Sequence, residues 1–224
     1  MSQELSFRTT TCAKRGHPEF TLRVARPVVP SLEHILLSYL EEAVAGGATF
    51  VPGETLQFGW STLRVLHRGD GTLGLEERTG PATWTESVDQ TLEQTWLQKE
   101  IAASVGVALR LEFPRQDQTA MVAECARGSS IVVLSRIPAE MPSFSGWTVT
   151  CGDSHDHGKR AFPTLLELGT QLPFLPQFLA LPTGVGVLVA TGLSPGRIRA
   201  HVWVDGAEVV PTEGSLLATL NAPA

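Results

Sequence analysis

Short runs of alternating apolar and polar residues recur along this chain of 224 residues, and turn-forming residues separate them. In the first part, Leu5 to Thr11 and Phe20 to Val24 alternate on either side of the turn-prone segment 14–18, which reads Lys-Arg-Gly-His-Pro. Alternation with a period of two is typical of a half-buried strand, so the two runs predict an antiparallel hairpin. Strands of this kind, mixed with a few helices, form α+β domains rather than helical bundles.

Further alternating runs extend this pattern over the rest of the chain. Leu56 to Leu66 and Thr72 to Glu77 flank a turn with Asp70 and Gly71, and Asp-Gly favours a hairpin. The second half predicts strands at 121–126, 131–135, 146–151, 185–190, 197–204 and 207–210. Where the third of these begins, Gly146 precedes Trp147, which predicts a buried aromatic side chain where the missing Cβ lets the backbone come close.

The helical segments are fewer. Apolar residues at helical spacing predict a helix that Ser31 caps and that ends at Gly46 and Gly47. The segment from Trp84 to Val105 predicts a second helix, with Ser87 in the position of a capping box. Two short helices are predicted at 163–169, beginning with Pro163, and at 174–181.

The length of the chain favours two domains, because a single core usually takes about 100–150 residues. The polar segment 113–118 contains Pro114, which ends regular structure, and this segment predicts the boundary. We therefore expect an α+β protein of two small domains, 1–115 and 116–224. Each is expected to be a mainly antiparallel sheet packed with one or two helices.

Composition and charge argue against several classes of partner. The net charge of −6 is spread over both halves, so neither half is basic enough to bind a nucleic-acid backbone. No apolar run approaches the roughly 20 residues of a membrane helix, and the first four residues lack the pattern of a secretory signal. We expect a cytoplasmic protein that binds neither nucleic acid nor membranes. The sequence does not indicate its oligomeric state.

One segment concentrates the side chains that catalytic sites use. Residues 152–158 read Gly-Asp-Ser-His-Asp-His-Gly, so a metal-assisted hydrolase that uses the loop from Asp153 to His157 is one alternative. Adjacent side chains diverge, however, whereas a nucleophile, its base and the orienting acid usually come from distant segments. We therefore predict no catalytic residue here and interpret the segment as a solvated loop.

A metal site in the same loop is also not predicted. His155 and His157 could share one face of an extended segment, but nothing else in the sequence has the spacing to complete a ligand shell. The three cysteines, Cys12, Cys125 and Cys151, are widely separated and match no paired ligand motif. We expect buried free thiols, no metal ligand and no cofactor.

Several short pieces occur in a particular order along the chain. In the second half they are Ser145 to Val149, Leu165 to Leu168, Pro173 to Leu175 and Leu181 to Gly184. Their order resembles the carboxy-terminal domain of bacterial immunity protein family 33, and residues 12–20, 37–42, 50–55 and 59–60 resemble the amino-terminal region of that family. The resemblance implies a binding protein that neutralises a toxin made by the same cell, rather than a catalyst.

The resemblance implies one kind of partner, a cognate toxin such as an effector delivered by a type VI or contact-dependent route. The acidic net charge suits a basic toxin, as nucleases often are. A structural adaptor whose domains bridge other partners is the second alternative. The candidate contact residues lie on the acidic face of the second helix and in two loops of the second half: Glu86, Asp89, Glu93, Ser143, Asp153 and His155.

Overall fold

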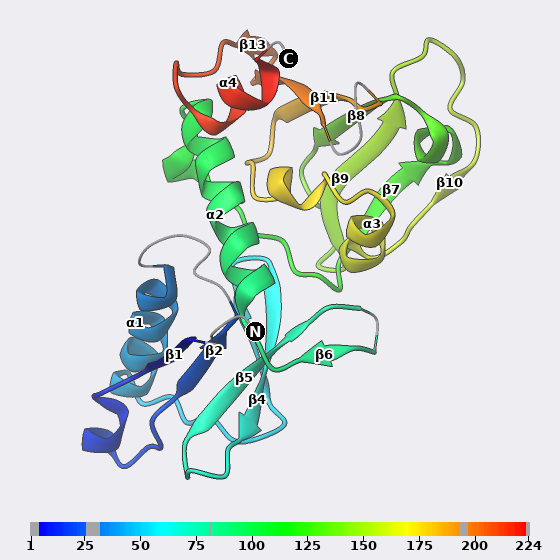
Figure 1. Ribbon diagram of the computed structural model, residues 1–224. Coiled ribbons are helices and arrows are strands. Elements are labelled where there is room, and N and C mark those ends of the chain that lie inside the picture. Colours follow the sequence, from blue (N-terminus) through cyan, green and yellow to red (C-terminus); the bar gives the residue numbers. More distant parts are fainter. Residues whose placement is uncertain (1–4, 26–31, 81, 193–196, 223–224) are drawn as a thin grey trace. The chain divides into compact units, whose positions relative to one another are not determined.

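The structure is a computed structural model of the chain, and it describes residues 5–25, 32–80, 82–192 and 197–222 (Figure 1). The chain forms two compact units, residues 1–96 and 97–224, and each is described by itself. Helices and mainly antiparallel sheets occur in both, which confirms the predicted α+β class. The division falls within helix α2 (Asp89–Ser104). The domain boundary that the sequence predicts after residue 115 stays a prediction.

The first unit combines a hairpin, a helix and a four-stranded antiparallel sheet (Figure 1). Strand β1 (Leu5–Arg8) pairs with β2 (Thr21–Val24), and helix α1 (Leu32–Ala45) shares an apolar core with them. The 3-10 helix η1 (Cys12–Arg15) lies in the hairpin loop. The sheet has the order β3 (Thr55–Phe58), β4 (Ser61–His67), β5 (Leu73–Arg78) and β6 (Trp84–Thr85).

Both predicted hairpins of the first unit are confirmed, with one change. Pairing of His67 with Leu73 closes the hairpin of β4 and β5, as predicted. The run from Leu56 to Leu66 is not one strand, because the chain turns at Gly59, whose φ of 58° suits glycine, and forms β3 and β4. Helix α1 agrees with the prediction, while its predicted cap, Ser31, lies outside the described residues.

Helix α2 begins later than predicted, at Asp89 instead of Trp84, because Trp84 and Thr85 pair with β5 as strand β6. The carboxylate of Glu77 on β5 accepts hydrogen bonds from the backbone N–H groups of Gln90 (3.2 Å) and Thr91 (2.7 Å). The first N–H groups of a helix lack partners within the helix, and a carboxylate there also suits the positive end of the helix dipole. A neighbouring strand, rather than the predicted capping box, therefore satisfies this helix start.

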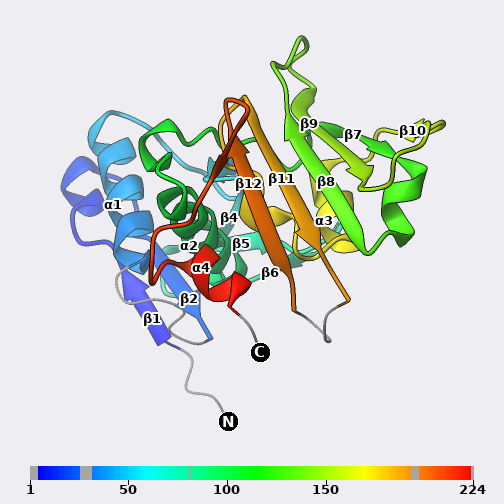
Figure 2. The same cartoon turned by 90° about the horizontal axis from the view of Figure 1, so that it is seen from above.

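The second unit is built on a seven-stranded sheet with the order β10-β7-β9-β8-β11-β12-β13 (Figure 2). Its neighbours are antiparallel except for β7 and β9, which run parallel. Most of these strands were predicted. Their bounds are β7 (Thr119–Ala123), β8 (Ile131–Arg136), β9 (Phe144–Cys151), β10 (Arg160–Ala161), β11 (Val185–Ala190), β12 (Arg199–Val204) and β13 (Ala207–Val209).

Short helices accompany the sheet, and α3 (Leu165–Gln171) and η4 (Pro176–Phe178) cover one face of it (Figures 1 and 2). The cap of α3 is a capping box of Thr164 and Glu167, so Pro163 precedes the helix instead of starting it as predicted. Three further short helices are η2 (Ala108–Arg110), η3 (Glu124–Gly128) and α4 (Leu216–Asn221). Among the described helices, none has both the length and the apolar composition that crossing a membrane requires.

Arg136 and Trp147 face each other across β8 and β9 and hold the segment after η4 against the sheet. The Arg136 guanidinium, on a residue 8% exposed, donates hydrogen bonds to the carbonyl oxygens of Glu112 (2.6 Å), Leu179 (3.3 Å) and Leu181 (2.6 Å). The Trp147 indole N–H donates to the same Leu179 oxygen at 3.0 Å. The predicted helix at 174–181 is shortened to the single turn η4, and side chains of the sheet bind carbonyl groups that follow this turn.

Replacing Trp147 by alanine should lower the free energy of unfolding by about 3–5 kcal/mol, the cost of emptying a large core site. Trp147 is 1% exposed, and the prediction that it packs inside the protein is confirmed. Urea denaturation of the purified chain measures the loss. Trp203 on β12 is half-buried on the same sheet, so Trp203→Ala is a matched control with a smaller expected loss. Equal losses in the two variants would contradict this account of the core.

Glu77 makes the stability of the first unit depend on pH. Burial raises the pKa of Glu77, and the N–H groups of Thr91 and Gln90 offset only part of that shift. A raised pKa means that the folded state binds the proton more tightly than the unfolded chain does. The stability that this group contributes is therefore present at low pH and is lost as pH rises through the raised pKa of the folded state.

The variant Glu77→Gln stays neutral at every pH and keeps one acceptor oxygen for the helix. We expect the wild type to lose stability relative to Glu77→Gln as pH rises from the ordinary carboxyl range through the raised pKa, and the difference then to level off. Urea titrations of both proteins over this range measure it. If the stability of the wild type instead increases relative to that of the variant as pH rises, the hydrogen bonds from α2 have a larger effect on the pKa of Glu77 than desolvation has.

Candidate functional site

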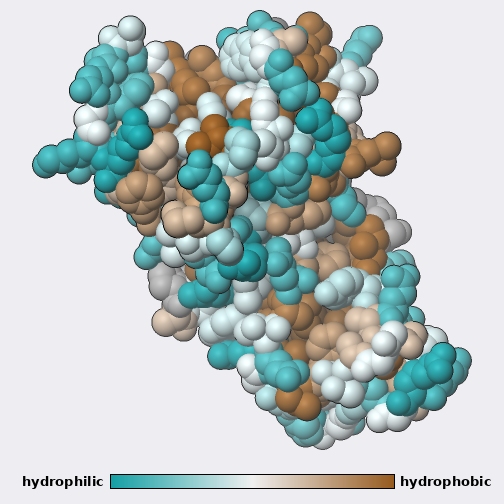
Figure 3. All heavy atoms as spheres, turned by 180° about the vertical axis from the view of Figure 1, so that it is seen from behind, coloured by the Kyte–Doolittle hydropathy of each residue, from teal (hydrophilic) through white to brown (hydrophobic). Residues whose placement is uncertain are grey.

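An apolar hollow of about 290 Å³ opens on the surface of the second unit. Three side chains around it, Ile137, Met141 and Phe162, are 43%, 61% and 61% exposed. Apolar residues also form patches between polar ones on the face drawn in Figure 3. Exposed apolar groups gathered around a depression are typical of an interaction site. The full lining consists of Thr119, Met121, Ile137, Pro138, Glu140, Met141, Phe144 and Phe162.

The loop that carries much of this lining, residues 137–143, is anchored at both ends. The Ile137 N–H donates to the Gly146 carbonyl at 2.9 Å, and the Phe144 N–H donates to the Met141 carbonyl at 3.0 Å. Gly146 has a φ of +81°, and a Cβ there would lie 2.3 Å from the Ile137 oxygen, so this approach requires glycine. The sequence prediction of a close backbone approach beside Trp147 is confirmed.

Ser143 is one of the predicted contact residues, and the structure places it at this hollow. It is exposed and precedes Phe144, and its carbonyl accepts hydrogen bonds from the N–H (2.8 Å) and the hydroxyl (3.2 Å) of Thr119. Both Phe144 and Thr119 line the hollow. The sequence analysis did not predict the apolar residues of the hollow. In the sequence, an exposed apolar residue cannot be distinguished from a core residue until the position of each strand is known.

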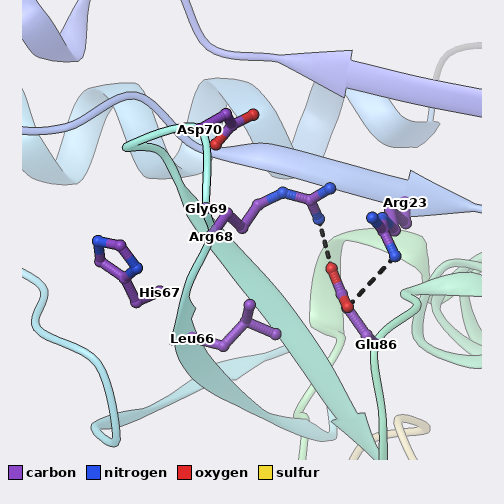
Figure 4. Close-up of a pocket in the computed structure, with 7 residues that line it drawn as sticks. All are labelled: Arg23, Leu66, His67, Arg68, Gly69, Asp70 and Glu86. Carbon is purple, nitrogen blue, oxygen red and sulfur yellow. Dashed lines mark hydrogen bonds and ion pairs between the residues drawn. The ribbon is translucent and has the colours of Figure 1, made fainter.

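Three other predicted contact residues, Glu86, Asp89 and Glu93, belong to the first unit. Glu86 pairs with Arg23 (3.3 Å) on β2 and with Arg68 (2.5 Å), which follows β4, and the two arginines reach its two oxygens at a hollow of about 360 Å³ (Figure 4). Asp89 accepts hydrogen bonds from the Ala25 N–H and from the Ser87 hydroxyl.

These partners bear on what the acidic groups contribute to binding. Glu86 is already compensated by two arginines, and Asp89 holds the chain end of β2 beside the start of α2, so both have roles inside the unit. Glu93 is half-buried on α2. Contact of these three residues with a toxin stays a prediction.

The loop 152–158 lies beside two cysteines, which the sequence did not indicate. Cys125 belongs to η3 and Cys151 ends β9, and one ligand atom from each of these cysteines and from His155 and His157 lies within 4.8 Å of the others. Linear spacing indicated no residue that could complete a ligand shell with the two histidines, whereas the fold places two cysteines beside them. The parallel pairing of β7 with β9 brings Cys125 to Cys151.

The remaining groups of this loop do not form a catalytic arrangement. Asp153 is exposed, and its backbone carbonyl accepts the N–H of His155 at 3.2 Å. Among the described residues, Ser154 forms no hydrogen bond with a histidine. Burial raises the pKa of the Cys151 thiol, and the neighbouring Cys125 thiol adds to the shift. A buried, protonated thiol is a poor nucleophile.

Comparison with known protein families gives a match for this chain. Residues 97–205 match the family model of the Imm33-like domain, and the match lies within the second unit. This part of the chain is therefore similar to the Imm33-like domain. No curated protein and no solved structure matches the chain. The match does not include the amino-terminal pieces, so their resemblance to the family stays a prediction.

Proposed function

We propose that this chain is an immunity protein that binds a toxin made by the same cell and neutralises it in the cytoplasm. The observation that carries the proposal is the match of residues 97–205 to the Imm33-like domain. All residues that line the apolar hollow fall within the matched stretch. The hollow is therefore the proposed docking site for the toxin.

The chemistry of the hollow defines the surface that fits it. Ile137, Met141 and Phe162 offer apolar contact on anchored backbone, and buried apolar anchors dominate the energy of protein interfaces. Glu140, on the rim, is exposed and suits a basic group of the partner. We propose that the toxin inserts apolar side chains into the hollow and places a lysine or arginine beside Glu140.

The charge of the whole chain supports a finer proposal about the toxin. A net charge of −6 attracts a basic partner and speeds association, as expected for a nuclease. We propose an effector delivered between bacteria by a type VI or contact-dependent route. Ser143 belongs to this docking site, whereas Glu86, Asp89 and Glu93 would act through long-range attraction.

The sequence leaves two alternatives to the proposed function. A metal-assisted hydrolase at the loop from Asp153 to His157 lacks support from the hydrogen bonds around Ser154, and immunity families generally consist of binding proteins. A structural adaptor would bind partners without protecting cells from a toxin. Protection of cells therefore separates the proposed function from both alternatives.

The double variant Met141→Asp, Phe162→Asp should abolish protection of cells that express the toxin encoded next to this protein. Losing two buried apolar anchors costs about 2 kcal/mol or more for each, so the affinity for the purified toxin should fall at least about 100-fold. Calorimetric titration measures the affinity, and growth measures protection. Both side chains are exposed in the free chain, so its melting temperature should stay close to that of the wild type.

The control is Leu109→Asp, which changes a more exposed apolar residue on η2 outside the hollow. This variant should protect cells and bind as the wild type does. A second comparison reverses Glu86, Asp89 and Glu93 to lysine, which should slow association without abolishing protection. If this triple variant loses protection while the hollow variant keeps it, the docking site lies in the first unit and the proposal about the hollow is wrong.

A further inference from the structure

We propose that Cys125, Cys151, His155 and His157 form a structural zinc site in the second unit. Two thiolates and two imidazoles are a ligand set that zinc binds in a tetrahedron. The sulfur and nitrogen atoms of the four residues all lie within 4.8 Å of one another. No role in toxin binding is needed for this inference, which goes beyond the proposed function.

The distances between the ligand atoms suit a tetrahedral zinc ion. Zn–S bonds of about 2.3 Å and Zn–N bonds of about 2.0 Å place neighbouring ligand atoms about 3.3–3.8 Å apart. The Cys151 sulfur lies 3.0 Å from Nε2 of His155 and 3.6 Å from Nδ1 of His157. The Cys125 sulfur lies 3.4 Å from the same Nδ1 of His157. Small side-chain rotations bring these atoms to equal distances from one central ion.

The surroundings orient the ligands. Nδ1 of His155 lies 2.8 Å from the carbonyl oxygen of Asp156, so this nitrogen carries the proton and Nε2 presents its lone pair to the site. The two imidazole rings are 5.0 Å apart and inclined at 62°, which lets both reach one point. A second hydrogen bond, from the backbone N–H of Gly158 to the Asp156 carboxylate (3.0 Å), forms the turn beside His157.

One end of the loop is fixed to the sheet and the other to η3. The Gly152 N–H donates to the Ile131 carbonyl at 2.8 Å, and a Cβ on Gly152 would lie 2.4 Å from a methyl carbon of Ile131. At the other end, the Lys159 carbonyl accepts the N–H of Glu124, next to Cys125, at 3.1 Å. The loop is thus closed over η3, and the zinc ion would join its middle to Cys125 and Cys151.

Four protein ligands define the role of the ion. A catalytic zinc site keeps one position open for water or substrate, whereas a four-ligand site is closed and structural. The ion would replace side-chain packing that this polar loop lacks, since residues 152–156 and 158–160 are exposed. The ion would also explain the positions of Cys125 and Cys151. These are two of the three cysteines of the chain, and they belong to different elements but lie beside the same two histidines.

The experiment measures zinc in the purified full-length chain. After removal of metals under reducing conditions and titration with zinc sulfate, native mass spectrometry should show one zinc ion per chain and the melting temperature should rise. Co²⁺ added instead of zinc should give the visible absorption of tetrahedral thiolate coordination. The variants Cys151→Ser and His155→Gln should each lose stoichiometric zinc and the cobalt absorption.

The control is His201→Gln, since His201 is an exposed histidine on β12 of the same unit, and this variant should keep one zinc ion. Alkylation of the wild type gives a test that needs no variant, because zinc should protect the half-buried Cys125 from iodoacetamide. Absence of zinc binding, zinc binding that Cys151→Ser and His155→Gln leave unchanged, or equal alkylation with and without zinc would overturn the proposal.

Discussion

The second unit depends on a buried positive charge that backbone carbonyl groups solvate. Burying a cation costs several kcal/mol unless polar groups replace water around it. Arg136 obtains this replacement from the carbonyls of Glu112, Leu179 and Leu181, with the Glu112 carboxylate 3.6 Å away. Burial still lowers the pKa of Arg136, which the charge of Glu112 opposes. Because the three carbonyls come from two segments outside the sheet, Arg136 connects both segments to it.

The same strand register connects this core to the proposed docking site. Arg136 is opposite Trp147 in the antiparallel pair of β8 and β9. Ile137, which follows Arg136, and Gly146, which precedes Trp147, are therefore joined by the hydrogen bond at which the loop 137–143 begins. The loop therefore leaves the sheet directly beside this buried pair of residues. Apolar residues on such an anchored loop lose little conformational freedom on binding, which favours affinity.

The sequence predicts most strands and the first hairpins because alternation and turn residues are local signals. Residues 97–205 were also recognised, since short pieces such as Ser145 to Val149 keep their order. Features that rest on distant contacts were not predictable: pairing of β6 with β5 moves the start of α2, and Arg136 binds carbonyl groups of two segments outside the sheet. The cysteines show this most clearly. Only the pairing of β7 with β9 brings Cys125 to Cys151, and linear spacing carries no trace of it.

The central claim is that the toxin binds the Imm33-like domain at the hollow around Met141 and Phe162. Hydrogen–deuterium exchange of this protein, alone and in complex with the purified toxin, tests it most directly. Slower exchange on binding is predicted for residues 137–144 and 160–162, with residues 84–93 unchanged. Slower exchange confined to residues 84–93, with the loop 137–144 as fast as in the free protein, would contradict the account.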